Sequence, residues 1–202
     1  MVDLDNDGWP DIFVVTGSFY PGIDRQLPQY ASKSPRLVFR NLGNGTFEEL
    51  GEQAGPAITE VHSSRGCAFG DFDNDGDIDI LIVNMNEPPS LLRNDLRGTN
   101  HWLKVKLVGT KSNRSAIGAR VLVRYGKKVQ AQAVVSQSSF YSCNDQRLHF
   151  GLGAETTADI EIHWPNGGSQ KVAGVPGDQL VTIQEGAGII PSKGWAEKKT
   201  KP

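Results

Sequence analysis

A segment near the start of the chain, DLDNDGWPDIFVV at residues 3–15, occurs a second time as DFDNDGDIDILIV at residues 71–83. The copies match at most positions, with aspartates at the same places followed by an apolar run rich in β-branched residues. Self-similarity of this kind is typical of repeated structural units that pack against one another. The chain is therefore expected to contain at least two copies of one small β unit.

The aspartates follow the spacing D-x-D-x-D-G-x-x-D, which allows a compact loop to wrap a hard cation. Calcium takes about six to eight oxygen ligands and tolerates irregular geometry, whereas magnesium usually keeps several waters. An EF-hand loop shares the first six positions but requires a glutamate at the twelfth, between two helices. Here the twelfth residues are Val14 and Ile82, within strand-like runs, and Asp11 and Asp79 supply a ninth-position carboxylate. The pattern predicts a cation loop between strands.

The alternative interpretation is an ordinary Asp/Asn/Gly turn, because these residues favour turns through local hydrogen bonds. Two copies with carboxylates at the same positions favour the cation loop. Uncompensated like charges beside a buried strand would be strongly unfavourable.

The remaining sequence has the pattern of short strands. Residues 36–50 predict a hairpin with its turn at Asn44-Gly45, and SLLRND at residues 90–95 is a weaker echo after the second loop. From about His101, alternating segments separated by Gly, Asn and Pro turns are typical of a β-sandwich or barrel. No segment predicts a long helix, so the expected class is all-β.

Two family resemblances make these patterns more specific. The aspartate loops resemble those of FG-GAP/VCBS repeats in integrin-α-like β-propellers, in which each repeat is a four-stranded blade with a calcium loop between two strands. Three downstream motifs resemble the ASPIC/UnbV domain, which commonly follows such repeats. They are NHWLKVKLVGTKSNRSAIGARVLV (100–123), LHFGLG (148–153) and IEIHWPNGGSQ (160–170). SQSSFYSCND (136–145) departs from the glycine-rich turn and Tyr-Ser-Gln stretch typical of that family.

The resemblances imply partial β-propeller blades followed by a β-sandwich-like domain. The implied divisions are an incomplete FG-GAP/VCBS propeller region at 1–98, an ASPIC/UnbV domain at 99–186 and a flexible Lys-rich tail at 187–202. Ca2+ is the implied cofactor. Its implied ligands are Asp3, Asp5, Asp7, the Trp9 carbonyl and Asp11 in the first loop, and Asp71, Asp73, Asp75, the Asp77 carbonyl and Asp79 in the second.

The second loop is expected to bind calcium more tightly than the first. A strand-like segment, RGCAFG at residues 65–70, precedes it, whereas only Met1 and Val2 precede the first loop. Ordering a free terminus costs about 1–2 kcal/mol for each backbone residue fixed.

Charge is unevenly distributed along the chain. Residues 1–100 hold sixteen acidic and seven basic side chains and residues 101–202 hold seven and fourteen, so the halves carry −9 and +7. Such asymmetry can indicate a nucleic-acid-binding domain. However, Lys104, Lys106, Arg120 and Arg124 lie within alternating strand patterns, so we do not expect sequence-specific nucleic-acid binding.

No catalytic motif is evident, whether a nucleophile elbow, a phosphate-binding glycine loop or HExxH. His101, His149 and His163 each adjoin an aromatic residue in strand-like sequence, as packed or surface histidines do. We therefore predict a non-enzymatic adhesion or interaction module with a protein or glycan ligand. An extracellular, cell-surface or periplasmic location would supply calcium at millimolar levels. The alternatives are an accessory enzyme acting on a polysaccharide or in a biosynthetic pathway, and a nucleic-acid-binding protein.

The two cysteines, Cys67 and Cys143, lack CxxC spacing, and two buried free thiols are favoured over one long-range disulfide. No apolar run approaches the roughly 18 residues of a transmembrane helix. We also expect a fragment of a longer protein with an unpaired sheet edge, because two repeats cannot close a ring of about four to eight blades.

Overall fold

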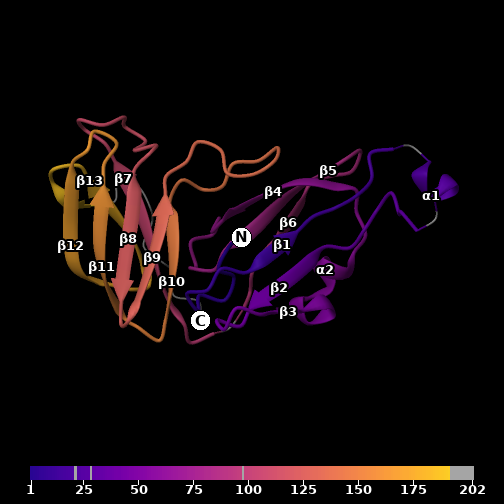
Figure 1. The fold of residues 1–202 in the computed structure, drawn as a ribbon, viewed down its shortest axis with the longest axis horizontal. Helices are drawn as coiled ribbons and strands as arrows, with labels where there is room; N and C mark the ends of the chain where they lie inside the picture. Colours follow the sequence, from indigo (N-terminus) through magenta and orange to yellow (C-terminus); the bar gives the residue numbers. More distant parts are fainter. Residues whose placement is uncertain (21, 28, 97, 192–202) are drawn as a thin grey trace.

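The computed structural model describes residues 1–20, 22–27, 29–96 and 98–191, which fold into four β-sheets. Two sheets belong to the N-terminal half and two to the C-terminal half, and the halves lie side by side along the longest axis (Figure 1). The described helices are short: α1 (Ile23–Gln26), α2 (Pro56–Thr59) and a 3-10 helix (Gly51–Ala54). None has the length and apolar character required to cross a membrane. The predicted all-β class is confirmed.

The N-terminal half consists of two antiparallel three-stranded sheets, ordered β1-β2-β3 and β4-β5-β6. Buried side chains of both sheets form one core, in which Phe13 meets Phe69 edge-on with ring centroids 6.2 Å apart. The predicted hairpin is β2–β3, and Asn44 Oδ1 accepts a hydrogen bond from the Thr46 N–H at 3.0 Å in its turn. The strands are β1 (Ile12–Val14), β2 (Leu37–Asn41), β3 (Phe47–Glu49), β4 (Ser64–Gly70), β5 (Asp79–Asn84) and β6 (Ser90–Leu92).

The repeat seen in the sequence is also a repeat in structure, because one aspartate loop leads into β1 and the other joins β4 to β5. At the base of the second loop, Gly70 pairs with Asp79. In the first loop, the equivalent residues Val2 and Asp11 form an isolated β-bridge. Each sheet has three strands where the family pattern implies four, and the first loop is nevertheless closed at its base.

The C-terminal half is a β-sandwich of two four-stranded sheets, ordered β10-β7-β13-β14 and β12-β11-β8-β9. Inward-facing residues of both sheets share one core that includes Val105, Val123, Phe150 and Ile160. Most neighbours are antiparallel, but β13 runs parallel to β7. The strands are β7 (His101–Val108), β8 (Arg120–Tyr125), β9 (Lys128–Ala133), β10 (Leu148–Gly153), β11 (Thr157–His163), β12 (Ser169–Pro176), β13 (Gln179–Gln184) and β14 (Gly188–Ile190).

Strand β14 corrects the predicted start of the tail at residue 187. Thr182 of β13 pairs with Ile190, so regular structure continues beyond Gly186. The turn 185–187 joins two hydrogen-bonded strands and is part of the sandwich. Residues 192–202, to which the rest of the predicted tail belongs, lie outside the described residues.

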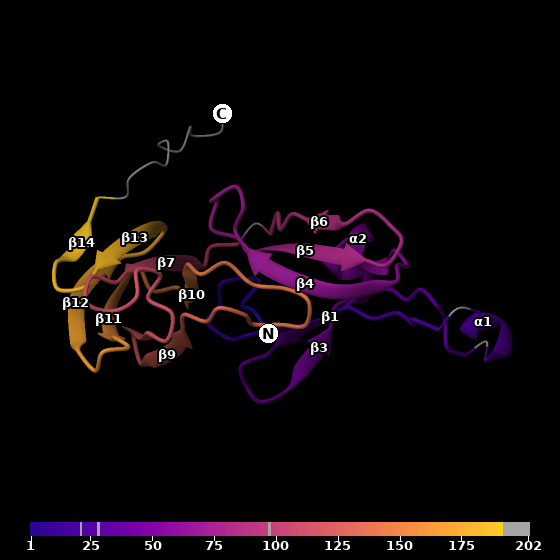
Figure 2. The same cartoon turned by 90° about the horizontal axis from the view of Figure 1, so that it is seen from above.

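The connection between β9 and β10 extends from the sandwich to the edge of β4 (Figures 1 and 2). The Asp145 N–H donates to the Phe69 carbonyl at 2.9 Å, and the Phe69 N–H donates to Asn144 Oδ1 at 3.1 Å. The edge of β4 is therefore paired in part; the predicted unpaired sheet edge was not assigned to a strand and stays a prediction. Cys67 is buried in β4, but Cys143 is exposed in this surface connection, so only one of the two free thiols is buried as predicted.

Candidate metal centres

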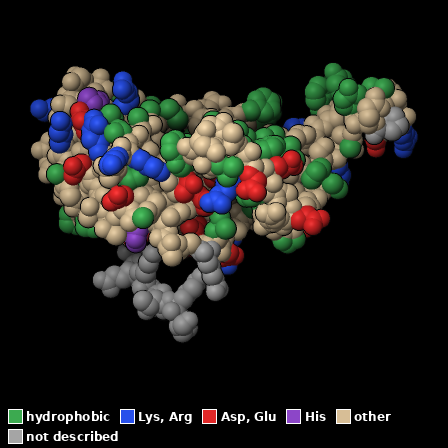
Figure 3. Space-filling view, turned by 60° about the horizontal axis from the view of Figure 1, so that its bottom comes forward, with side chains coloured by type: hydrophobic (Ala, Val, Ile, Leu, Met, Phe, Trp, Pro, Cys, Tyr) green, Lys and Arg blue, Asp and Glu red, His purple; other side chains and the backbone are tan. Residues whose placement is uncertain are grey.

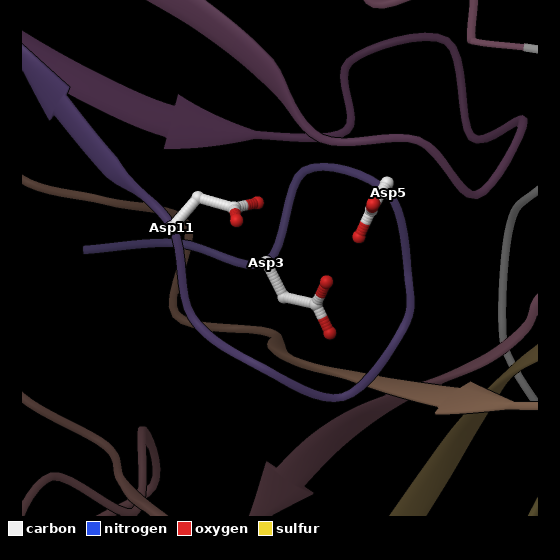
Figure 4. A group of neighbouring side chains, drawn as sticks. All are labelled: Asp3, Asp5 and Asp11. Carbon is white, nitrogen blue, oxygen red and sulfur yellow. The ribbon is translucent and has the colours of Figure 1, made fainter. Parts of the chain in front are cut away.

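Each aspartate loop brings three carboxylates together. Asp3, Asp5 and Asp11 form one group, in which one oxygen of each residue lies within 4.8 Å of the others (Figure 4). The second group obeys the same distance limit and consists of Asp71, Asp73 and Asp79. These are the first, second and last carboxylates of each predicted ligand set.

The two loops share an unusual backbone conformation. The fourth residue of each loop has a left-handed φ, 59° at Asn6 and 60° at Asn74, and the sixth is a glycine with φ of 87° at Gly8 and 101° at Gly76. Asparagine and glycine are the residues that adopt this region most readily. The D-x-D-N-D-G pattern therefore encodes the turns that direct the carboxylates inward.

The ninth-position aspartates, Asp11 and Asp79, are oriented by identical hydrogen bonds. In each residue, each of the two carboxylate oxygens accepts a hydrogen bond from a different backbone N–H, at 2.8–2.9 Å. These donors hold the carboxylate in place and leave further lone pairs for a cation. The donors are Leu4 and Asn41 for Asp11, and Phe72 and Asn94 for Asp79.

The other predicted ligands lie outside the converging groups. Asp7 Oδ1 accepts the Trp9 N–H at 2.7 Å and Asp75 Oδ1 accepts the Asp77 N–H at 3.0 Å, so both side chains stabilise the turn. The side chain of Asp77 accepts a hydrogen bond from Asn6 Nδ2 at 3.2 Å. Cation ligation by Asp7, Asp75 and the carbonyls of Trp9 and Asp77 remains a prediction.

Asp3 carries the least compensated carboxylate of the first loop. Oδ2 accepts the Gly8 N–H at 2.9 Å, but Oδ1 is buried and has no hydrogen-bond partner among the described residues. Burial, followed by the charges of the neighbouring aspartates, raises the pKa of Asp3 to about 7, against the opposing hydrogen bond from Gly8. A buried carboxylate oxygen without a donor is the feature that a bound cation would satisfy.

Asp71, the equivalent residue of the second loop, is compensated. Its oxygens accept the N–H groups of Asp75 at 3.1 Å and Gly76 at 3.0 Å, and Oδ2 also accepts a hydrogen bond from Lys104 Nζ. Both members of this ion pair are buried, with 0% of Asp71 and 1% of Lys104 exposed. Burial lowers the pKa of Lys104, and the carboxylate opposes this by favouring the charged form.

Five further loop aspartates share one electrostatic trend. Burial is the main cause that raises the pKa of Asp77 to about 6, and the charges of neighbouring aspartates raise it further. The same two causes raise the pKa of Asp7, Asp11, Asp75 and Asp79. Each loop therefore concentrates more negative charge than its surroundings stabilise.

The sandwich packs directly against both loops, and glycines permit the close approach. A Cβ on Gly151 of β10 would lie 2.1 Å from Asp3 Oδ2, and one on Gly76 would lie 1.9 Å from the Trp102 ring nitrogen. Asn6 joins the parts, because its Nδ2 donates to the Gly76 carbonyl at 3.1 Å and its Oδ1 lies 2.7 Å from His149 Nε2. Both candidate centres therefore lie at the contact between the two halves.

Sequence reasoning missed the residues that the sandwich contributes to this contact. They include Lys104 and Arg147. The Arg147 guanidinium donates to Asn74 Oδ1 at 2.7 Å and to the Asp71 carbonyl at 3.1 Å. His149 is kept neutral, because burial and the nearby Lys104 charge lower its pKa to about 3. The sequence feature that pointed to this contact was the opposite net charge of the two halves, because basic residues of the second half face acidic loops of the first. Figure 3 shows acidic side chains gathered near the middle of one face, with basic side chains at the sandwich end.

Comparison with known proteins gives two domain matches. The FG-GAP-like repeat family matches residues 3–82, and the ASPIC and UnbV family matches residues 109–190. The second match includes β14.

Curated relatives match both parts together. Cartilage acidic protein 1 is 32% identical in Mus musculus and 30% identical in Homo sapiens, in each case over 170 residues that cover 82% of this chain. The aligned region is 25% and 24% of those relatives, so the chain spans about a quarter of their length. The chain thus carries an FG-GAP-like repeat region followed by an ASPIC and UnbV domain, and it is homologous to that part of cartilage acidic protein 1.

Proposed function

We propose that the chain is a calcium-binding interaction module that acts at the cell surface, outside the cell or in the periplasm. Its domain composition and its similarity to a protein named for cartilage support an extracellular interaction role. Calcium binding is the more specific part of the proposal, and it rests on the two loops. Carboxylate loops of moderate affinity are suited to the millimolar calcium found outside cells.

The observation that carries the proposal is the buried, unpartnered Oδ1 of Asp3 within a group of three converging carboxylates. A hard cation would provide the missing partner and offset the repulsion among Asp3, Asp5 and Asp11. The donor set consists of oxygens in an irregular loop, which favours calcium over magnesium, an ion that demands near-octahedral geometry. Asp3, Asp5 and Asp11 would hold the first ion, and Asp71, Asp73 and Asp79 the second.

Exposed apolar side chains support the interaction role. Leu81 and Val83 of β5 and Leu91 of β6 are each about half exposed on the face of their sheet that points away from the first sheet. Phe19 and Tyr20 are also exposed, on the segment before α1 that projects from the end of the molecule (Figure 1). Clusters of exposed large apolar residues often mark contact surfaces for partners. A protein or glycan ligand would use these surfaces.

The basic residues give little support to nucleic-acid binding. Lys104 is buried against Asp71, so it cannot contact a phosphate backbone. Lys128 donates to the Asp7 carbonyl at 3.1 Å and lies 4.8 Å from the centre of the Trp9 ring. Two basic side chains of the second half are therefore already directed at the acidic loops.

Histidine contacts favour a binding role over a catalytic one. His101 pairs with Asp178 at 2.7 Å and His163 with Glu161 at 3.3 Å, both at the surface of the sandwich. These pairs join side chains within one domain, and His149 is held neutral between the halves. In this arrangement the histidines stabilise local structure.

Isothermal titration calorimetry and thermal unfolding test calcium binding. Calcium at a hundred times its dissociation constant adds about 2.7 kcal/mol of stability for each site. We expect calcium to raise the melting temperature well above that in chelator, and magnesium to raise it less. D24N, which removes an exposed aspartate outside both loops, is the matched control and should leave this rise unchanged. No binding heat and no calcium-dependent rise would refute the proposed function.

A ligand screen tests the interaction role. Glycan and protein arrays probed with the chain, with and without calcium, should give ligands whose binding depends on calcium. Ligands retained equally by a chain with charged replacements at Leu81 and Leu91 would exclude the outer face of the second sheet as the contact surface.

A further inference from the structure

The two loops differ in what neutralises their first aspartate, and the difference assigns a role to Lys104. On the basis of the proposed calcium function, we infer that the Lys104 ammonium group is a permanent positive charge at the second loop. It takes over part of the role of calcium at Asp71. The second loop is therefore the weaker calcium site of the two, and it keeps its structure when calcium is absent.

Lys104 reaches the loop from the other half of the molecule. It lies on β7 of the sandwich, and its Nζ donates to Asp71 Oδ2, the oxygen that also accepts the Gly76 N–H. Because both side chains are fully buried, salt in the solvent screens the pair only weakly. The charge of Lys104 is therefore a fixed feature of this loop.

The first loop lacks an equivalent buried cation among the described residues. The sandwich presents Gly151 to Asp3, and a Cβ there would lie 2.1 Å from Oδ2. Two basic residues near this loop are exposed: Arg40, which pairs with Asp5 at 2.8 Å and has 46% of its side chain exposed, and Lys128, whose Nζ donates to the Asp7 carbonyl at 3.1 Å. Exposed ion pairs are weak and screened, so Arg40 can turn away when an ion binds.

A fixed positive charge repels an incoming divalent cation. For a unit charge within several ångströms of the ion, the repulsion weakens calcium binding by about tenfold or more. The first loop is thus expected to bind calcium more tightly, the reverse of the order of affinities expected from the sequence, which assumed a free terminus before the first loop. The Val2 N–H donates to the Asp11 carbonyl at 3.0 Å and the Asp11 N–H donates to the Val2 carbonyl at 2.7 Å, so the backbone before the first loop is already ordered.

Calcium titration of two matched variants tests the ranking without changing Lys104. D73N removes a ligand of the second loop and D5N removes the equivalent ligand of the first. The site left in D73N should bind calcium at least about tenfold more tightly than the site left in D5N. Equal affinities, or tighter binding in D5N, would overturn the role of Lys104 while leaving calcium binding intact. If the unmodified chain gave no measurable heat of calcium binding, the proposed function would instead be refuted.

K104M in the D5N background tests the lysine itself. We expect the calcium affinity of the second loop to rise about tenfold or more, and the melting temperature in chelator to fall, because Asp71 loses its partner. K106M is the matched control, since Lys106 lies on the same strand but is exposed, and it should change neither quantity. A K104M chain with unchanged or weaker calcium affinity would show that Lys104 serves packing alone. The comparison of D73N with D5N decides the question even where K104M does not fold.

Discussion

The first and second aspartate loops have nearly the same sequence and the same backbone conformation, yet their surroundings differ. Asp3 meets a glycine of the sandwich and retains a buried oxygen without a partner, whereas Asp71 meets a buried lysine. The ligands of a loop therefore determine whether it can bind a cation. Its neighbours determine how much it needs one.

Among the variants that test this comparison, D71N should change the stability most when it is measured in chelator. Removal of the Asp71 charge leaves Lys104 buried without a counterion, which should destabilise the protein by about 3–5 kcal/mol. For a chain of this size, each kcal/mol lowers the melting temperature by about 2–4 °C. The double variant K104M/D71N removes both charges and should recover much of the loss in the same thermal unfolding measurement. A D71N chain as stable as the unmodified one would show that the ion pair contributes nothing.

The equivalent substitution in the first loop should have the opposite sign. D3N removes a buried charge without a partner and places its amide near the carboxylates of Asp5 and Asp11, so stability in chelator at pH 8 should rise by about 1–3 kcal/mol. The same variant should lose the calcium response of the first loop. Urea unfolding in chelator measures the first effect and calorimetry the second. Destabilisation by D3N in chelator would mean that the two loops are equivalent after all.

The pH dependence of the calcium-free protein should report the same buried carboxylate. The pKa of Asp3 is about 7 in the folded protein and 3.8 when unperturbed, so between these values the folded state binds the additional proton. Stability therefore falls as pH rises from about 4 to about 7. Calcium should remove much of this fall, because it stabilises the ionised form. Urea unfolding at pH 5 and pH 8 in chelator should show the decrease, and D3N should reduce it. A rise in stability over this range would contradict the assignment.

The smallest effect should come from Arg40, an exposed cation beside the first loop. R40Q breaks the pair with Asp5, in which nearly half of the Arg40 side chain is exposed, so stability should change by less than about 1 kcal/mol. Calcium affinity should change by less than it does for K104M. An effect of R40Q as large as that of K104M would remove the distinction between buried and exposed cations.

Much of the candidate site could be predicted from local sequence. The carboxylate positions, Asn6 with its left-handed φ and the loop glycines are all set within one short motif, because the loop folds on its own backbone bonds. The β class and the hairpin at Asn44-Gly45 follow from alternation and turn residues in the same way.

The rest depends on contacts distant in sequence. Lys104 looks like an ordinary alternating strand residue, and only the packing of β7 against the second loop buries it beside Asp71. The pairing of β4 with Asn144 and Asp145 likewise comes from a connection that extends across from the sandwich. One sequence shows that the halves carry opposite charge, but it does not show which residues meet.

The most direct test is a crystal structure at limiting calcium, with anomalous diffraction collected at long wavelength. We predict an anomalous peak among Asp3, Asp5 and Asp11, and a second peak of lower occupancy among Asp71, Asp73 and Asp79. At saturating calcium both peaks should reach full occupancy. The absence of a peak in either loop, or a second loop that fills first, would contradict this account.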